Sequence, residues 1–274
     1  MDFSDGAMNA MNFAIQTANK VGSNIMLVWV EKKRNSMSIY SDANDPRLEV
    51  KKRFEEIIEN NQDKLTVGKF MYKMRNGKIY RELVNQAKYH DALMIVAGTH
   101  GASGFEEFWI GSNANKIVIY SECPVVTIRN EYQCDKPVKT IVLPMDSTRE
   151  TRQKVPYTGQ LAKLYEAKVL LLSLYSSTHQ TIRDLVNGYT DQAREYLTGR
   201  EIENETFSLE SSNLTESTIE FAREHEADLI SIMTEQETAT ANLLIGPYAQ
   251  QMVNHCPIPV LSIRPKAIYD WQTK

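Results

Sequence analysis

The sequence predicts an α/β protein made of two tandem domains, each built on a doubly wound parallel sheet. Short runs of Val, Ile and Leu alternate with amphipathic helical patterns throughout the chain. Continuous apolar strands separated by helices are typical of parallel sheets that are covered on both faces. Landmarks of the first half recur in the second half, and the length of 274 residues suits two domains better than one.

The expected elements follow from this alternation. A helical pattern ends at Gly22, and Asp45-Pro46 is typical of a helix start. First-half strands are expected at 25–30, 70–74, 92–97 and 125–129, with helices at 7–21, 46–58, 79–87 and 112–121. Second-half strands are expected at 140–144, 168–175, 202–208, 229–233 and 260–264, with helices at 150–165, 182–197, 214–225 and 247–254. Ligands of such sheets bind beyond the carboxyl ends of the strands.

The repeat is clearest at the end of each half. Residues 123–129 read Cys-Pro-Val-Val-Thr-Ile-Arg, and residues 258–264 read Ile-Pro-Val-Leu-Ser-Ile-Arg. An Ile-Gly pair ends at Gly111 and again at Gly246, at the same distance before each motif. This correspondence indicates that one structural unit occurs twice.

A polar hinge at 130–139 separates the two halves. It places the domain boundary near residue 135 and predicts domains of 1–134 and 135–274. Further upstream in each half, we align the apolar run that begins at Asp91 with the run that begins at Asp228.

One strand of the first half is missing from this pattern. The second half opens with a strand at 140–144 followed by Met145 and Asp146, whereas the first half opens directly with Met1 and Asp2. We therefore expect the first domain to lack its first strand, which is normally central in such a sheet. One hypothesis is that Met1 is an internal methionine of a longer natural chain. The alternative is that a segment of a partner chain fills the place.

Composition and charge exclude several classes of protein. The formal net charge is −4 and no basic cluster dominates, so a nucleic-acid-binding protein is not expected. No apolar run approaches the roughly 18 residues of a membrane-spanning helix, and the first residues do not resemble a signal peptide. Cys123, Cys134 and Cys256 are too scattered for a disulfide framework or a zinc site. We expect a cytoplasmic protein that does not bind membranes.

The glycine-rich segment between 96 and 113 carries the candidate chemistry. Its glycines are spaced as Gly98-x2-Gly101-x9-Gly111, and Ser112 follows directly. Glycine lacks a Cβ, so the backbone can approach a phosphate, and a helix that begins at Ser112 adds N–H donors. The alternative is a tight strand–helix loop in which Ser112 is the helix N-cap. The spacing, the Gly-Ser pair and the strand–helix context favour phosphate binding.

This pattern resembles the tandem universal stress proteins over nearly the whole chain. The resemblance rests on the glycine spacing, on the motif at 123–129 and on Asp-Phe-Ser at 2–4. It implies adenine nucleotide alpha hydrolase-like domains, with ATP bound in the first domain, with or without Mg²⁺. In ATP-binding members, an aspartate contacts the adenosine and a valine lines the adenine pocket. The nucleotide-binding residues that the resemblance implies are Asp2, Val30, Gly98, Gly101, Gly111, Ser112 and Asn113.

The second half departs from this signature. Where the first half has Gly98-Thr-His-Gly, the alignment places Thr234-Glu-Gln-Glu after a shortening of two residues. Gly246 is kept, but Pro247 replaces the serine, which removes the hydroxyl and one N–H donor. We therefore expect a degenerate second domain and one nucleotide per chain. Asp146 is expected to cap the segment that follows it.

Other polar residues near the loop have weaker claims to a ligand. His100 and Lys116 could reach phosphates, but simple exposure on a loop or a helix face is the favoured interpretation. Asp2 and Asp5 could hold a phosphate-associated Mg²⁺, although a helix N-cap at Ser4 or Asp5 is favoured. No spacing of ligands for a protein-bound metal is present, so no metal site is expected.

The sequence offers no catalytic arrangement. It has no Ser-His-Asp set and no Walker Gly-Lys-Ser/Thr motif. No general base or transition-state arginine can be named, so slow ATP hydrolysis is the most that we expect. A nucleotide-dependent regulator or sensor in a stress response is the favoured function. The alternatives are an adenylate-transferring enzyme of the same superfamily and an interaction module whose loop binds nothing.

The last strand of each half would lie at a sheet edge. Exposed apolar edges are normally paired or covered. The resemblance implies that the strands at 125–129 and 260–263 pair with each other, so that the two halves form an intramolecular pseudo-dimer. A homodimer of the whole chain stays an open alternative.

Overall fold

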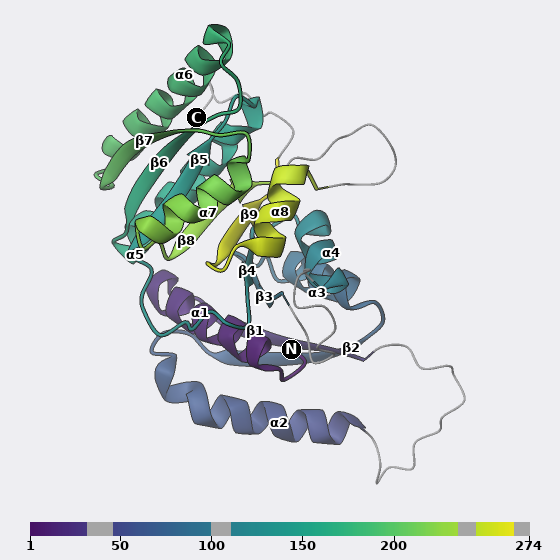
Figure 1. Ribbon diagram of the computed structural model, residues 1–274. Coiled ribbons are helices and arrows are strands. Elements are labelled where there is room, and N and C mark those ends of the chain that lie inside the picture. Colours follow the sequence, from purple (N-terminus) through teal and green to yellow (C-terminus); the bar gives the residue numbers. More distant parts are fainter. Residues whose placement is uncertain (32–45, 100–110, 235–244, 266–274) are drawn as a thin grey trace.

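The computed structural model describes residues 1–31, 46–99, 111–234 and 245–265. Helices and strands alternate in both halves, as the sequence predicts (Figure 1). The first half contains α1 (Asp5–Val21), β1 (Ile25–Glu31), α2 (Pro46–Asn61), β2 (Phe70–Asn76), α3 (Ile79–Tyr89), β3 (Ile95–Gly98), α4 (Ser112–Tyr120) and β4 (Val125–Ile128). The second half contains β5 (Thr140–Met145), α5 (Val155–Tyr165), β6 (Lys168–Tyr175), α6 (Gln180–Thr198), β7 (Asn204–Glu210), α7 (Leu214–Glu224), β8 (Leu229–Met233), α8 (Pro247–His255) and β9 (Val260–Ile263).

Several elements differ from their expected bounds. The strand expected at 92–97 is β3, which begins only at Ile95. The helix expected at 150–165 opens as a 3-10 helix over Arg149–Lys154, and α5 follows it. Pro156 has no N–H to donate, so the preceding turn cannot continue an α-helical ladder. The strand expected at 202–208 is β7, two residues later. None of the helices in the described segments combines the length and apolar character needed to cross a bilayer.

Seven strands form one sheet, in the order β3-β4-β9-β8-β5-β6-β7. Neighbouring strands are parallel except for β4 and β9, which are antiparallel, with Val126 opposite Leu261. Because β4 ends the first half and β9 ends the second, this pair joins both halves into one sheet (Figure 1). The expected pairing of the two last strands is therefore confirmed.

The strands of the first half are divided between two sheets. β1 and β2 form a separate parallel pair, with Ile25 opposite Phe70. In the second half, β5 lies between β6 and β8 and joins them. Within the described part of the first half, no strand occupies the matching place between β1 and β3. The expected lack of a first strand is confirmed, and it splits the sheet.

Helix α1 packs against both parts of the first half. The Oγ of Ser4 accepts a hydrogen bond from the N–H of Ala7 at 3.3 Å, and the helix ends at Gly22, which has a φ of 71°. The expected helix end is therefore confirmed. Phe13 is 2% exposed and packs into the large core of the seven-stranded sheet, whereas Met11 belongs to a smaller core with β1 and α2.

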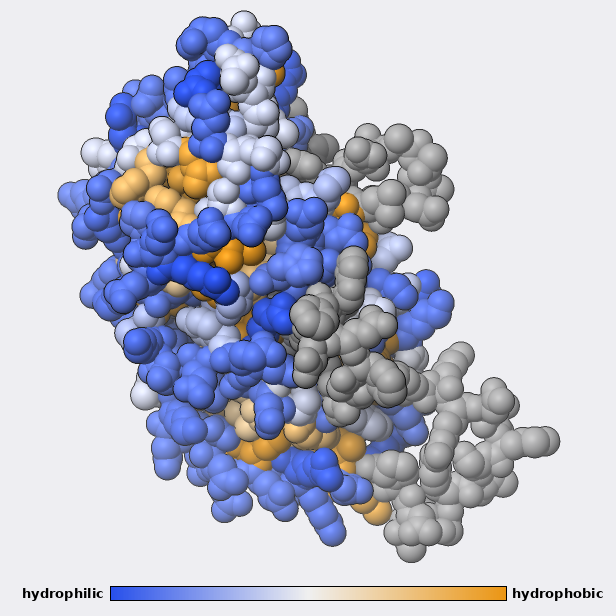
Figure 2. All heavy atoms as spheres, viewed as in Figure 1, coloured by the Kyte–Doolittle hydropathy of each residue, from blue (hydrophilic) through white to orange (hydrophobic). Residues whose placement is uncertain are grey.

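The smaller core is less completely covered than the large one. Phe54 is fully buried at its centre and stacks on Tyr72, with ring centroids 5.0 Å apart. Met1, Phe3 and side chains of α2 around it are only partly buried. Figure 2 shows apolar side chains at the surface beside α2 and the β1–β2 pair.

Candidate functional site

The described site residues lie where the first-half strands end. Val30 is near the end of β1, and Gly98 ends β3. Asp2 precedes α1, whereas Ser112 and Asn113 begin α4. These residues come from segments far apart in the sequence, which is typical of ligand sites beyond the carboxyl ends of parallel strands.

Three contacts bring these segments together. The amino group of Met1 donates to the carbonyl oxygen of Val28 in β1 at 2.5 Å. The first turn of α1 lies against the end of β3. The N–H of Gly111 donates to the carbonyl oxygen of Thr99 at 2.7 Å. The ends of β1 and β3 and the start of α4 are thus linked through α1 and Thr99.

Gly98 is required by packing as well as by any ligand. A Cβ placed on Gly98 would lie 2.9 Å from the carbonyl carbon and oxygen of Gly6, in the first turn of α1. Both of those atoms belong to the backbone, so no flexible side chain can move aside. A close helix–strand approach is therefore a second reason for glycine at this position, beside the approach of a phosphate.

The glycine loop is held at both of its ends. The N–H of Thr99 donates to the carbonyl oxygen of Ile128 at 2.9 Å, and the carbonyl oxygen of Thr99 accepts from Gly111. A Cβ on Gly111 would lie 3.0 Å from that same oxygen, so glycine fits this closure best. Gly101 and His100 lie outside the described residues.

The amino terminus of α4 has no capping side chain among the described residues. Gly111 is the N-cap residue, with a φ of −55° and a ψ of 140°. Ser112 is the first helical residue and is exposed, so the alternative in which Ser112 caps the helix is wrong. No acidic residue lies in the first turn. This helix end combines first-turn N–H donors with the positive end of the helix dipole, an arrangement that favours an anion.

Asp2 has the same local geometry as its counterpart in the second half. Its Oδ1 accepts from the N–H of Ser4 at 3.2 Å and from the Ser4 hydroxyl at 2.7 Å. The Oδ1 of Asp146 accepts from the N–H and the hydroxyl of Thr148 in the same way. The expectation that Asp146 caps the segment after it is therefore confirmed, and Asp2 forms an equivalent turn.

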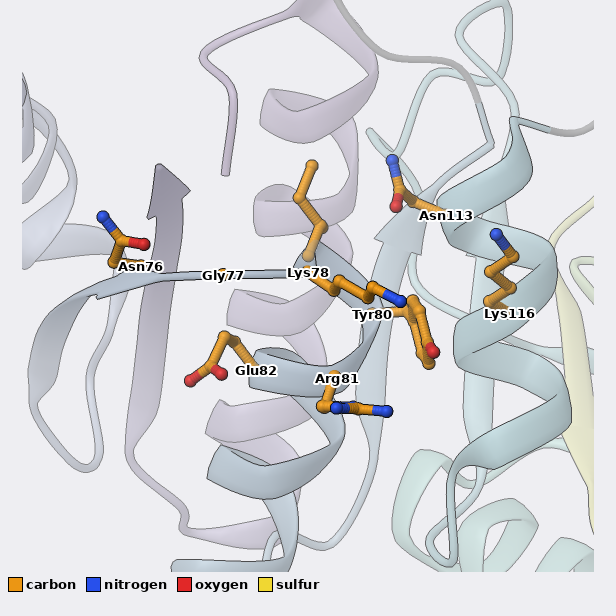
Figure 3. A pocket seen from close by; sticks show the side chains of 9 residues that line it. Asn76, Gly77, Lys78, Tyr80, Arg81, Glu82, Asn113 and Lys116 are labelled. Atoms are coloured by element: carbon orange, nitrogen blue, oxygen red, sulfur yellow. The ribbon is translucent and has the colours of Figure 1, made fainter. Parts of the chain in front are cut away.

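A groove of about 670 Å³ runs between α4 and the turn that joins β2 to α3. Figure 3 shows Asn113 and Lys116 extending from α4 toward this turn. The Nζ of Lys116 lies 5.6 Å from the ring centroid of Tyr80. The groove is lined by Asn76, Gly77, Lys78, Ile79, Tyr80, Arg81, Glu82, Asn113 and Lys116.

Basic side chains dominate the charge of this groove. Lys78, Arg81 and Lys116 contribute three cations, and Glu82 is the one acidic lining residue among the described ones. Of these three cations, only Lys116 is near enough to Ser112 in the sequence to be predicted as a phosphate contact. The sequence signal that could have drawn attention to Lys78 and Arg81 is the Asn76-Gly77 pair before them, which is typical of a turn. Gly77 has a φ of 146° in this turn.

The described residues contain no group of three or more His, Cys, Asp or Glu side chains that could hold a metal ion. Ser4 is the N-cap of α1 and Asp5 lies in the first helical turn, so the N-cap interpretation is confirmed for Ser4.

In the second half, the backbone hydrogen bond at the start of the loop is the same as in the first half. The N–H of Thr234 donates to the carbonyl oxygen of Ile263 at 2.9 Å, which repeats the bond from Thr99 to Ile128. Thr234 is therefore the counterpart of Thr99. From each threonine the chain reaches its Ile-Gly pair over the same number of residues.

This register corrects the sequence alignment of the two halves. The alignment of Asp91 with Asp228, and the two-residue shortening inferred from it, are wrong. Asp91 has a φ of 48°, and the residue with the same φ and place in the second half is Glu226. Met233 then takes the place of Gly98. The first loop glycine is lost, as expected, but the loop is not shortened.

The helix after the second loop lacks one donor. Gly246 is the N-cap of α8, with a φ of −63° and a ψ of 155°, and Pro247 is the first helical residue. Its geometry matches that of Gly111 and Ser112 in the first half. The expected loss of an N–H and a hydroxyl at this position is therefore confirmed.

The universal stress protein family model matches residues 1–129 and 137–264. The chain belongs to the universal stress protein family. Two family domains in one chain explain the internal repeat, and β4 and β9 are the last strands of these two domains.

Relatives of this universal stress protein agree with the assignment. Universal stress protein YxiE of Bacillus subtilis strain 168 is 36% identical over 87 residues. That match covers 30% of this chain and 57% of YxiE, so the chain spans little more than half the length of this curated relative.

Solved structures support the fold over nearly the whole chain. A universal stress protein from Archaeoglobus fulgidus DSM 4304 covers 97% of this chain and 94% of its own, with 16% identity and a TM-score of 0.74. A Pseudomonas aeruginosa PAO1 protein of unknown function covers 93% of this chain and 87% of its own, with 15% identity and a TM-score of 0.65. At such identities the likeness concerns the fold alone.

Proposed function

We propose that this universal stress protein binds ATP in its first half and acts as a nucleotide-dependent regulator or sensor in a stress response. The observation that carries the proposal is the amino terminus of α4, with its glycine N-cap, no capping side chain and no acidic residue in its first turn. Such a helix end favours the negative charge of a phosphate. Family membership supports the role in stress.

In this proposal each site residue contacts a particular part of the nucleotide. Asp2 and Val30 contact the adenosine. The ribose and phosphates are contacted by Gly98, Gly101, Gly111, Ser112 and Asn113. The N–H groups of the last two residues and the Ser112 hydroxyl donate to phosphate oxygens.

The groove beside α4 supplies positive charge for the phosphates. Lys78 and Lys116 both line it, and Asn113 belongs to the groove and to the proposed nucleotide site. Basic side chains near a helix amino terminus add to its attraction for an anion. Mg²⁺, where it accompanies ATP, is held mainly by the phosphates.

A sensor is favoured over an adenylate-transferring enzyme. The groove holds one carboxylate among its described lining residues, and no carboxylate pair for acid–base catalysis lies among these residues. The second half lacks the donor that Ser112 supplies, because Pro247 stands in its place. One nucleotide per chain follows from this difference.

We also infer that the functional units are 1–134 and 135–274, and that the protein acts in the cytosol. The proposed boundary falls between β4 and β5, outside both sheets. Cys123, Cys134 and Cys256 are free thiols, which suits a reducing compartment.

The small-molecule content of the purified full chain tests the proposal. Mass spectrometry of the material released on denaturation, followed by incubation with ATP, separates the alternatives. We expect bound adenine nucleotide, or binding of added ATP, with slow release of inorganic phosphate at most. Rapid release of pyrophosphate would support the adenylate-transferring enzyme instead, and no binding at all would support the interaction module.

A further inference from the structure

The groove between α3 and α4 has a counterpart in the second half that is bridged by a hydrogen bond. Helices α3 and α7 both have 11 residues and begin at Ile79 and Leu214. α7 is joined to α8, because the Thr215 hydroxyl donates to the Oε1 of Gln251 at 2.8 Å. At the matching place in the first half lies the groove of about 670 Å³.

The three cations of the groove have no basic counterparts in the second half. Counting from the starts of the corresponding helices gives each of these lining residues a partner position. The counterparts of Lys78, Arg81 and Lys116 are Asn213, Glu216 and Gln251. The fold therefore does not require positive charge at these positions, so the cations of the first half need another explanation.

Two of these cations lie where a helix disfavours positive charge. Lys78 is the N-cap of α3 and makes no capping hydrogen bond, and Arg81 lies in the first turn. In α7, by contrast, the Asn213 side chain accepts from the N–H of Glu216, which is acidic. The amino end of a helix carries positive charge and favours anions. An unfavourable local placement without a compensating contact is typical of a functional site.

The cations are also available to a ligand. Within the part of the chain that the structure describes, Lys78, Arg81 and Lys116 form no ion pair. Lys88, at the other end of α3, is paired with Glu122 at 2.8 Å. Figure 3 shows Lys78 and Arg81 on one side of the groove and Lys116 on the other.

We propose that this groove binds a linear chain of condensed phosphates. Cations on both sides of a groove suit an extended anion better than a single phosphate group. The described lining has few apolar side chains, chiefly Ile79 and Tyr80, so charge and not apolar burial would drive binding. The inference goes beyond the proposed function, because it requires neither adenosine nor the glycine loop. The chain is either free condensed phosphate or the tail of a nucleoside tetraphosphate.

Calorimetric titration of inorganic tripolyphosphate into the full chain, without divalent cations, tests the proposal. We expect Lys78→Gln/Lys116→Gln to lower the affinity about tenfold or more, because two charge-assisted contacts are lost. The second half holds amide side chains at both positions, so the fold should accept the change. The matched control Lys52→Gln/Lys73→Gln removes the same charge from exposed residues outside the groove and should lower the affinity by less than about threefold.

Ser112→Pro separates this proposal from the proposed function. It alters the amino terminus of α4 but none of the lining residues, so tripolyphosphate should still bind it. A full chain that fails to bind ATP but binds tripolyphosphate would contradict the proposed function alone. The groove proposal is overturned if the full chain does not bind tripolyphosphate, or if Ser112→Pro or the matched control loses as much affinity as the groove variant. Equally tight binding of a hexaglutamate peptide would overturn it in favour of an acidic protein partner.

Adenosine 5′-tetraphosphate distinguishes the two sources of the chain. If the chain is the tail of a nucleotide, this probe should bind about tenfold more tightly than ATP and lose that advantage in the groove variant. If the chain is free condensed phosphate, tripolyphosphate should bind at least as tightly as the tetraphosphate, which then has no advantage over ATP.

Discussion

Gly98 and Gly188 show how differently two glycines of one chain are constrained. A Cβ on Gly98 would meet the backbone of Gly6 at 2.9 Å, whereas a Cβ on Gly188 in α6 would have no heavy atom within 4 Å. The spacing of the glycine loop marks Gly98 as a ligand residue, but a contact with a distant turn is not visible in a local pattern. The fold therefore adds a packing role that the sequence could not predict.

Replacement of Gly98 by alanine should destabilise the protein. We expect Gly98→Ala to lower the free energy of unfolding by about 1–3 kcal/mol, because α1 or β3 must shift to admit the methyl group. The control Gly188→Ala should leave the stability unchanged or raise it by about 0.5–1 kcal/mol, since alanine is the better helix former. Urea unfolding measures both changes. Equal stability of the two variants would contradict the close approach of α1 to β3.

Burial of the Cys256 thiol makes the stability of the protein depend on pH. Its side chain is 2% exposed, and burial raises the pKa of the thiol from its usual 9.0 to about 12. The folded chain therefore keeps the thiol proton at pH values where the unfolded chain has lost it. This contribution to stability is complete below the unfolded pKa and is lost as the pH rises from there toward the folded pKa.

Comparing wild type with Cys256→Ala at two pH values separates the effect of this thiol from that of other groups that titrate at alkaline pH. Between pH 8 and about pH 10, wild type should lose about 1 kcal/mol of unfolding free energy relative to Cys256→Ala. Urea unfolding of both proteins under reducing conditions gives the difference at each pH. A difference that does not change with pH would show that the thiol titrates alike in both states.

At the scale of elements, α1 has two buried faces and not one. The helical spacing in the sequence selects a single apolar stripe, which includes Met11 and Ala18. The structure places both of these residues in the smaller core. Phe13 lies off that stripe and packs into the large core, and the Thr17 hydroxyl lies 2.6 Å from the Tyr165 hydroxyl of α5. A helix that joins two cores cannot be recognised from one stripe.

Truncation of Phe13 should reveal this second face. We expect Phe13→Ala to lower the free energy of unfolding by about 3–5 kcal/mol, because a large side chain leaves a well-packed core. Leu48→Ala on α2 is the control, since Leu48 is 51% exposed, and it should change the stability by less than about 0.5 kcal/mol. Thermal and urea unfolding measure both variants. A Phe13→Ala effect as small as the control would place this side chain outside the core.

β9 is the element that holds the two halves in one sheet. It lies between β4 and β8, so its removal opens an edge on each of them. Deletion of 258–274 should make the remaining chain aggregate or self-associate. Deletion of 266–274 alone keeps β9 and should not. Size-exclusion chromatography with light scattering compares the two, and an unchanged monomer after the longer deletion would refute the pairing as a structural requirement.

At the scale of the whole molecule, features that repeat along the chain were predictable. The alternation, the tandem repeat and the missing strand follow from periodicity and repeated landmarks, whereas the pairing of the last strands was implied by the family resemblance. The register between the halves was not predictable, because the apolar runs at Asp91 and Asp228 align well with a shift of two residues. The backbone hydrogen bonds of Thr99 and Thr234 decide it.

The groove could not be predicted from the sequence, for a different reason. Lys78 lies beside α3, whereas Asn113 and Lys116 belong to α4. Two segments that meet only after folding leave no common motif in the sequence. The glycine spacing predicts where phosphates would bind in the proposed site, but nothing in the sequence indicates the basic groove beside it.

Comparison of the two halves suggests a substitution that tests the proposed nucleotide site. Gly111 and Gly246 cap their helices with similar extended geometry, but Ser112 follows the first and Pro247 the second. The second half therefore shows that proline fits this helix position, and the extended residue before it suits proline. Ser112→Pro removes a hydroxyl and one N–H donor with little cost to the fold.

Calorimetric titration of ATP into the full chain, Ser112→Pro and Pro247→Ser tests the central claim most directly. Circular dichroism first checks that both variants are folded. The account predicts one ATP per chain, a loss of about tenfold or more in affinity for Ser112→Pro because charge-assisted donors are removed, and unchanged binding for Pro247→Ser. Failure of the full chain to bind ATP, two sites per chain, or equal affinity in all three proteins would contradict it.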